Sequence, residues 1–142
     1  MNQAAEIFNF VWTLLEKPDR TPRETELMIH AAHASRFLWE EEGTAVNHAR
    51  GEWQVSRAYA VAGRPGPALH HAALCLEIAE AEELAPFDLA CAHEAIARAF
   101  LIAGDTERAR DHELQARALA HRITDEDERG VGLPDLATPA VQ

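Results

Sequence analysis

Cysteines, basic residues and long apolar runs are all scarce in this chain of 142 residues. Its two cysteines, Cys75 and Cys91, fit neither a disulfide framework nor a C-x-x-C redox motif. The apolar run from Ile7 to Leu15 is too short to span a bilayer, and it lacks a basic lead or a small-residue cleavage site. We therefore expect a cytoplasmic protein with reduced thiols and no membrane contact.

Positive charge is also in short supply, with 13 Lys and Arg against 24 Asp and Glu and a net charge of −11. A general nucleic-acid binder needs a basic face to neutralise phosphates, so this balance argues against that class. Residues 123–142 form an acidic tail with a net charge of −4, from Asp125, Glu126, Asp127, Glu128 and Asp135 against Arg129. With two glycines and two prolines as well, the tail is predicted to be irregular or disordered.

Aromatic residues make up only 6% of the chain, and the 7 glycines and 7 prolines fall mostly between periodic apolar segments. Alanine supplies much of the apolar content, which allows helices to approach closely. The length suits one domain with a core. These features predict an all-α protein with a single domain over residues 1–122.

A repeat of 41 residues organises the chain. Gly63 and Gly104 are 41 residues apart, and at the same offset the chain matches Arg57 with Arg98, Tyr59 with Phe100, Ala62 with Ala103 and Ala68 with Ala109. Shifting back by 41 aligns Leu27 with Ala68, which indicates a third, divergent copy. Such a period is typical of helical repeats, whose units bury their apolar faces by stacking. We expect Gly63 and Gly104 to end helices with positive φ.

Local signals divide the chain into six expected helices. The strongest start is Thr21, where Pro22 and Glu24 complete a capping box. The helices are expected at about 2–17, 21–42, 44–62, from residue 68 after a turn at 64–67, 86–103 and 105–122. Gly51 is interpreted as a weak spot within the third helix, costing about 1 kcal/mol relative to alanine.

The order of an apolar residue, a small residue, an aromatic, a turn glycine and an alanine occurs twice, at Val55, Ser56, Tyr59, Gly63 and Ala68 and at Ile96, Ala97, Phe100, Gly104 and Ala109. This pattern resembles the tetratricopeptide repeat over about residues 5–122. Glu52 and His93 stand where the family has its leading tryptophan, and the period exceeds the usual length of about 34. The resemblance implies three stacked antiparallel helical hairpins that form a short right-handed superhelix.

The resemblance also implies a concave groove lined by the first helix of each hairpin. It would place Trp12, Arg50, Trp53, Arg57, Glu94 and Arg98 on that face. Guanidinium groups pair bidentately with carboxylates and tryptophan supplies contact area, so we expect a non-enzymatic scaffold that binds an acidic protein or peptide. The alternative is that these arginines form helix-surface ion pairs, such as Arg98 with Glu94.

A small metal-dependent or cysteine-dependent enzyme is the alternative class. His93-Glu94 and His112-Glu113 each begin an H-E-x-x-H motif, but Ala97 and Ala116 occupy the second histidine position. His30, His71 and His112 lie one period apart, and helices that stack at about 8–10 Å are too far apart for these histidines to share one zinc with ligand distances of about 2 Å. The pairs His30 with His33 and His48 with Glu52 offer two ligands each. We therefore expect no catalytic residues, no metal and no cofactor.

The first helix has more apolar surface than one packed side requires. At about 100° per residue, its seven apolar residues cover an arc of about 200°, whereas a helix packed on one side needs about 100°. Phe8, Phe10 and Trp12 therefore need a cover. A second copy of the chain, a partner protein or the tail through Leu133 and Leu136 could supply it, and we favour the homodimer.

Overall fold

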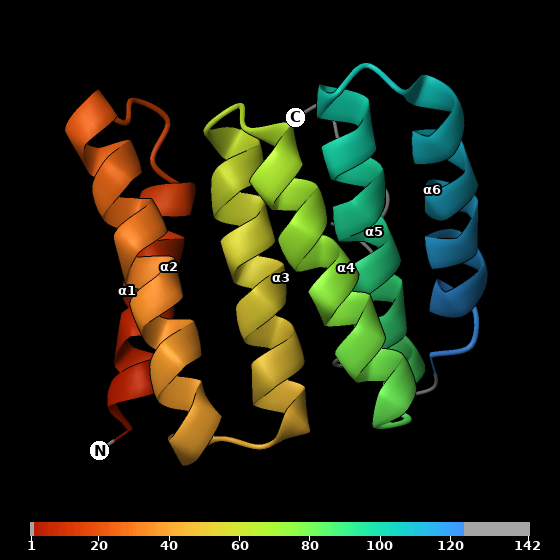
Figure 1. Cartoon of the computed structure of the whole chain (residues 1–142), viewed down its shortest axis with the longest axis horizontal. Helices are drawn as coiled ribbons and strands as arrows, with labels where there is room; N and C mark the ends of the chain where they lie inside the picture. Colours follow the sequence, from red (N-terminus) through yellow and green to blue (C-terminus); the bar gives the residue numbers. More distant parts are fainter. Residues whose placement is uncertain (1, 124–142) are drawn as a thin grey trace.

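The computed structural model describes residues 2–123, and this part of the chain holds six helices and no strand (Figure 1). The helices are α1 (Gln3–Leu15), α2 (Pro22–Glu42), α3 (Ala45–Val61), α4 (Pro65–Ala81), α5 (Pro86–Ile102) and α6 (Thr106–Ala120). The expected acidic tail, with Leu133 and Leu136, lies outside the described residues except for Ile123. None of the described helices is long and apolar enough to cross a membrane.

The helix starts follow local chemistry. The predicted capping box of α2 is confirmed, because the Glu24 backbone N–H donates to Thr21 Oγ1 at 3.1 Å and the Thr21 N–H donates to Glu24 Oε1 at 2.9 Å. The predicted turn at 64–67 is wrong, since α4 already begins at Pro65. Prolines fit in a first helical turn because the N–H groups there have no partner within the helix.

Three helix ends share one hydrogen-bond pattern. Gly63 and Gly104 have φ of 77° and 88°, which confirms the sequence prediction. The residue after each glycine closes the helix end with a hydrogen bond of 2.9 Å. The Arg64 N–H donates to the Tyr59 carbonyl and the Asp105 N–H donates to the Phe100 carbonyl, as in a Schellman motif. The end of α4 has the same bond, but Glu83 with φ of 50° takes the glycine position.

Consecutive helices pack against one another, so the expectation of three stacked helical hairpins is confirmed. The first helices also touch in series, α1 with α3 and α3 with α5. Within residues 2–123, the second helices α2, α4 and α6 make no such contacts with each other. The hairpins follow one another across the molecule from α1 and α2 to α5 and α6 (Figure 1). The first helices therefore form a continuous inner layer.

Small residues carry most of the helix contacts. In α3 and α4, Ala58, Ala68 and Ala72 are fully buried, and the Ser56 hydroxyl donates to the Ala68 carbonyl at 2.7 Å. A Cβ on Gly51 would lie 2.9 Å from Arg36 Cδ, so this glycine marks a close approach of α2 and α3. Its interpretation as a mere weak spot in the helix was therefore incomplete.

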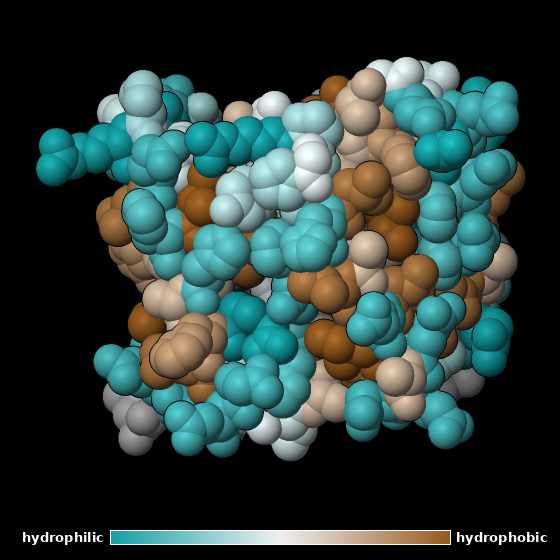
Figure 2. Space-filling view, viewed as in Figure 1, coloured by the Kyte–Doolittle hydropathy of each residue, from teal (hydrophilic) through white to brown (hydrophobic). Residues whose placement is uncertain are grey.

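Figure 2 shows the side of the molecule seen in Figure 1 as a space-filling surface. Hydrophilic side chains cover much of this side, and apolar side chains gather over α4 and α5. Among the described residues, the large apolar side chains with the highest exposed fractions are Phe37 at 76% and Leu114 at 58%.

The left-handed glycines allow a matched test of backbone strain. We predict that Gly104→Ala lowers the free energy of unfolding by about 1 kcal/mol, because an alanine at positive φ is strained. Gly104→Asn, the matched variant, should lower it by less, because asparagine adopts the left-handed conformation more readily than alanine. Urea denaturation of both variants checks the pair, and equal effects would contradict the account of the helix ends.

Candidate functional site

A pocket of about 240 Å³ lies against the first helices of the three hairpins. Its walls come from Phe8 and Trp12 of α1, Arg50 and Trp53 of α3, and Phe87 and Asp88 of α5, together with Ala49, Cys75 and Cys91. We call it the first-helix pocket. Its four aromatic residues come from three different helices, so the pocket exists only when the hairpins are stacked.

Two tryptophans and an arginine form one side of the site. The Trp12 and Trp53 rings lie 5.5 Å apart between centroids, at an interplanar angle of 38°. The Arg57 guanidinium carbon lies 5.8 Å from the Trp12 centroid and 5.7 Å from that of Trp53. Cation–π contacts of this kind are worth about 0.5–2 kcal/mol. The structure thus brings together these three of the predicted groove residues.

Arg50 and Asp88 connect α3 to the start of α5. Arg50 Nε donates to Asp88 Oδ1 at 2.8 Å and Nη2 to Oδ2 at 3.4 Å, while the Arg50 guanidinium lies 5.1 Å from the Phe87 ring centroid. The Asp88 side chain is buried, whereas that of Arg50 is 42% exposed. Arg50 therefore neutralises the buried Asp88 carboxylate, and its half-exposed side chain lines the pocket.

Glu94 and Arg98 form a buried ion pair on α5. Arg98 Nε donates to Glu94 Oε2 at 2.9 Å, and Trp53 Nε1 lies 3.4 Å from Glu94 Oε1. Glu94 and Arg98 are only 6% and 4% exposed. For Arg98, the structure shows the ion pair that the sequence left open as the alternative. The pair orients the Trp53 indole and does not line the first-helix pocket.

The sequence interpretation missed Phe87, Asp88 and Cys91 as pocket residues. Cys91 lies one period after Arg50, and Asp88 one period after Asn47, so the 41-residue repeat carried a usable signal for both. The apolar surface expected on the first helix, made of Phe8, Phe10 and Trp12, does not form one patch. Phe8 and Trp12 line the pocket, whereas Phe10 is not among the lining residues and is 42% exposed.

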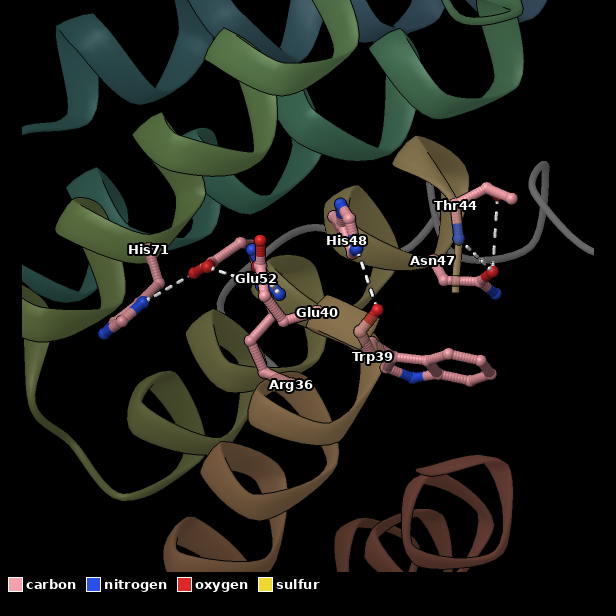
Figure 3. A network of polar contacts seen from close by, with 8 residues as sticks. All are labelled: Arg36, Trp39, Glu40, Thr44, Asn47, His48, Glu52 and His71. Carbon is pink, nitrogen blue, oxygen red and sulfur yellow. Dashed lines mark hydrogen bonds and ion pairs between the residues drawn. The ribbon is translucent and has the colours of Figure 1, made fainter. Parts of the chain in front are cut away.

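A separate network of polar side chains, away from the first-helix pocket, joins α2, α3 and α4 (Figure 3). Glu52 accepts hydrogen bonds of 2.8 Å from Arg36 Nε and from His71 Nδ1, and Arg36 also pairs with Glu40 at 3.0 Å. Burial raises the pKa of Glu52, but the hydrogen bonds from His71 and Arg36 outweigh it and hold that pKa below the ordinary value. Glu52 is thus a charged link between three helices.

A hollow of about 390 Å³ adjoins this network and has a larger volume than the first-helix pocket. Its charged lining includes Arg36 with Glu40, Glu77 and Glu82. Three carboxylates against one guanidinium disfavour an acidic ligand. The first-helix pocket is the better candidate because its aromatic walls offer contact area, its lining carboxylate Asp88 is paired with Arg50, and the Arg57 guanidinium lies against Trp12 and Trp53.

The third hairpin has a histidine pair at the positions that Glu52 and His71 occupy in the second. His93 Nδ1 and His112 Nδ1 lie 3.0 Å apart and their rings stack at 5.2 Å, so one nitrogen donates and the other accepts. Burial and the neighbouring His112 lower the pKa of His93, and burial lowers the pKa of His112. Both histidines stay uncharged at neutral pH.

Two further histidines have structural partners. His33 Nε2 shares a hydrogen bond of 2.8 Å with Tyr59 Oη, and His48 Nε2 donates to the Trp39 carbonyl at 2.8 Å. Within residues 2–123, no three or more His, Cys, Asp or Glu side chains are arranged to hold a metal ion.

Both thiols lie among apolar neighbours. Burial raises the pKa of Cys75 to about 12 and raises that of Cys91 as well, and the carboxylates of Asp88 and Glu94 act in the same direction. Because the thiolate is the nucleophilic form, thiols in this state are poor nucleophiles at neutral pH.

The fold and the site define an all-α protein of stacked helical hairpins with an aromatic, arginine-bearing pocket on its first helices. No family model, curated protein or solved structure matches this chain.

The His93 and His112 pair predicts an acid-sensitive fold. Their pKa values in the folded chain lie below the ordinary 6.5, so the unfolded chain binds more protons as the pH falls below 6.5. The pair's contribution to stability is complete above that pH and is lost below it, although Glu80 and Asp111 oppose the shifts of His93 and His112 respectively.

Urea denaturation at about pH 7.5 and about pH 5.0 tests the predicted loss of stability in acid, and the two pH values bracket the ordinary histidine pKa of about 6.5. The double variant His93→Gln, His112→Gln should lose less stability between the two pH values than the parent. His121→Gln, at an exposed histidine, should behave like the parent. A steeper loss in the double variant would show that the pair is not held neutral.

Proposed function

We propose that this chain is a non-enzymatic, tetratricopeptide-like binding module that holds an acidic peptide segment of a protein partner in the first-helix pocket. The observation that carries the proposal is the meeting of Trp12, Trp53 and Arg57 beside Arg50. Tryptophan and arginine dominate the energetics of protein recognition because they combine a large contact area with directed hydrogen bonds. The pocket is an apolar anchor site next to positive charge.

The size of the pocket supports a peptide side chain as its occupant. Sites for drug-sized ligands and cofactors usually enclose about 300–1,000 Å³, and the first-helix pocket is smaller at about 240 Å³. An aliphatic or aromatic side chain would fill it between Trp12 and Phe87, with neighbouring carboxylates reaching Arg50 and Arg57.

The tetratricopeptide-like part of the proposal rests on where the motif residues lie. The motif's small residue Ser56 bonds the Ala68 carbonyl, which closes the second hairpin at the motif's alanine. Gly63 ends α3 in the left-handed conformation. The first helices form the inner layer that such arrays use for ligands.

A peptide library displayed on phage tests the proposal, with the purified full chain as bait. We expect the selected peptides to combine Asp or Glu with large apolar residues. Arg57→Met should weaken their binding about tenfold, or ~1.4 kcal/mol, because it removes the charge and keeps the aliphatic stem.

Arg64→Met is the matched control, because Arg64 is exposed in the turn before α4. It should bind like the parent, and both variants should keep the parent's helical circular dichroism. Selected peptides that bind Arg57→Met and Trp12→Ala as tightly as the parent would show that the first-helix pocket is not their site.

We also propose that the chain forms a homodimer through α1. Phe10 is 42% exposed, and the described neighbours of α1 are α2 and α3. Sedimentation should show a dimer at micromolar concentration and a monomer for Phe10→Glu. Leu114→Glu, at an exposed residue on α6, is the control and should remain a dimer. A monomeric parent would rule the dimer out.

A further inference from the structure

The described chain ends beside the first-helix pocket. Ile123, the last described residue, is buried against Phe87, Ala90 and Ala120. Phe87 is at the same time a wall of the pocket. The residues that follow Ile123 therefore begin next to the site proposed to hold a peptide.

Segment 124–136 is long enough to reach every wall of the pocket. Its 13 residues can extend by about 3.3–3.6 Å each, or roughly 45 Å in all. The path from α5 across α3 to α1 covers two helix spacings of about 8–10 Å, or roughly 20 Å. The segment can therefore pass Arg50 and Trp53 and reach Trp12.

The charges favour this location over the rest of the molecule. Segment 124–136 has five acidic residues and one basic residue, a net charge of −4. Residues 1–123 have 12 basic and 19 acidic residues, a net charge of −7, so most of the surface repels it. At the first-helix pocket the lining carboxylate Asp88 is paired with Arg50 and Arg57 lies beside Trp12, whereas Glu40, Glu77 and Glu82 line the hollow with Arg36 as its one arginine.

The segment also has the apolar residues that the pocket suits. Val131, Leu133 and Leu136 follow the acidic run 125–128 and are separated by glycine, proline and aspartate. A leucine between Trp12, Trp53 and Phe87 would remove its apolar side chain from water. The order of an acidic run followed by apolar anchors matches the ligand proposed for the pocket.

We propose that segment 124–136 docks in the first-helix pocket of its own chain and competes with partner peptides. This inference rests on the proposed function, because it uses the same pocket and the same ligand chemistry. A tethered segment acts at an effective concentration of about millimolar, so even a weak cis ligand excludes weak partners. Only partners that bind more tightly than the tail would displace it.

The test uses the full chain and its tryptophans. In the double variant Leu133→Asp, Leu136→Asp the segment should leave the pocket, which moves the indole N–H resonances of Trp12 and Trp53. Trp39 is buried on α2 and is not a pocket residue, so its resonance should stay in place. The control Ala140→Asp, Val141→Asp adds the same charge outside the segment and should leave all three resonances unchanged.

A synthetic peptide of residues 124–136 separates the inference from the proposed function. We expect it to bind the Leu133→Asp, Leu136→Asp variant at least tenfold more tightly than the parent, because the parent's own segment competes. Equal binding to both would overturn cis docking while leaving a peptide-binding pocket in place. Binding to neither, with indole resonances that match the parent, would overturn the inference alone, since the phage selection decides the proposed function.

Discussion

The structure depends on the burial of α3, which contacts α1, α2, α4 and α5. A helical hairpin cannot cover its own apolar face, so each unit needs a neighbour. Small residues allow this packing, as the Ser56 bond to the Ala68 carbonyl and the contact of Gly51 with Arg36 show. The pocket follows from the stacking, because its walls belong to three successive first helices.

Charged and polar pairs take over where the tetratricopeptide pattern would have a large aromatic residue. Glu52 joins His71 in the second hairpin, and His93 joins His112 in the third. Buried ionic groups are weak sources of net stability, since desolvation offsets most of their attraction. Their directed hydrogen bonds do restrict how the two helices of a hairpin can pair, and the histidines make that restriction dependent on pH.

Two buried carboxylates organise the pocket. Asp88 fixes the Arg50 guanidinium over Phe87, and Glu94 lies between Arg98 and the Trp53 indole. A side chain held in one position loses less entropy when a ligand binds. Asp88 and Glu94 thus hold the Arg50 guanidinium and the Trp53 indole in place.

The sequence by itself determined the helices, the capping box at Thr21, the left-handed glycines and the 41-residue repeat, because these depend on residues near one another in the chain. The resemblance to the tetratricopeptide repeat also implied that Trp12, Trp53 and Arg57 share one face. Only the tertiary structure decided that Glu94 and Arg98 are buried beside Trp53, that Asp88 meets Arg50 and that Phe10 lies outside the pocket. Such partners are chosen by the rotation and crossing of packed helices, and a shift of a few ångströms between two helices exchanges one partner for another.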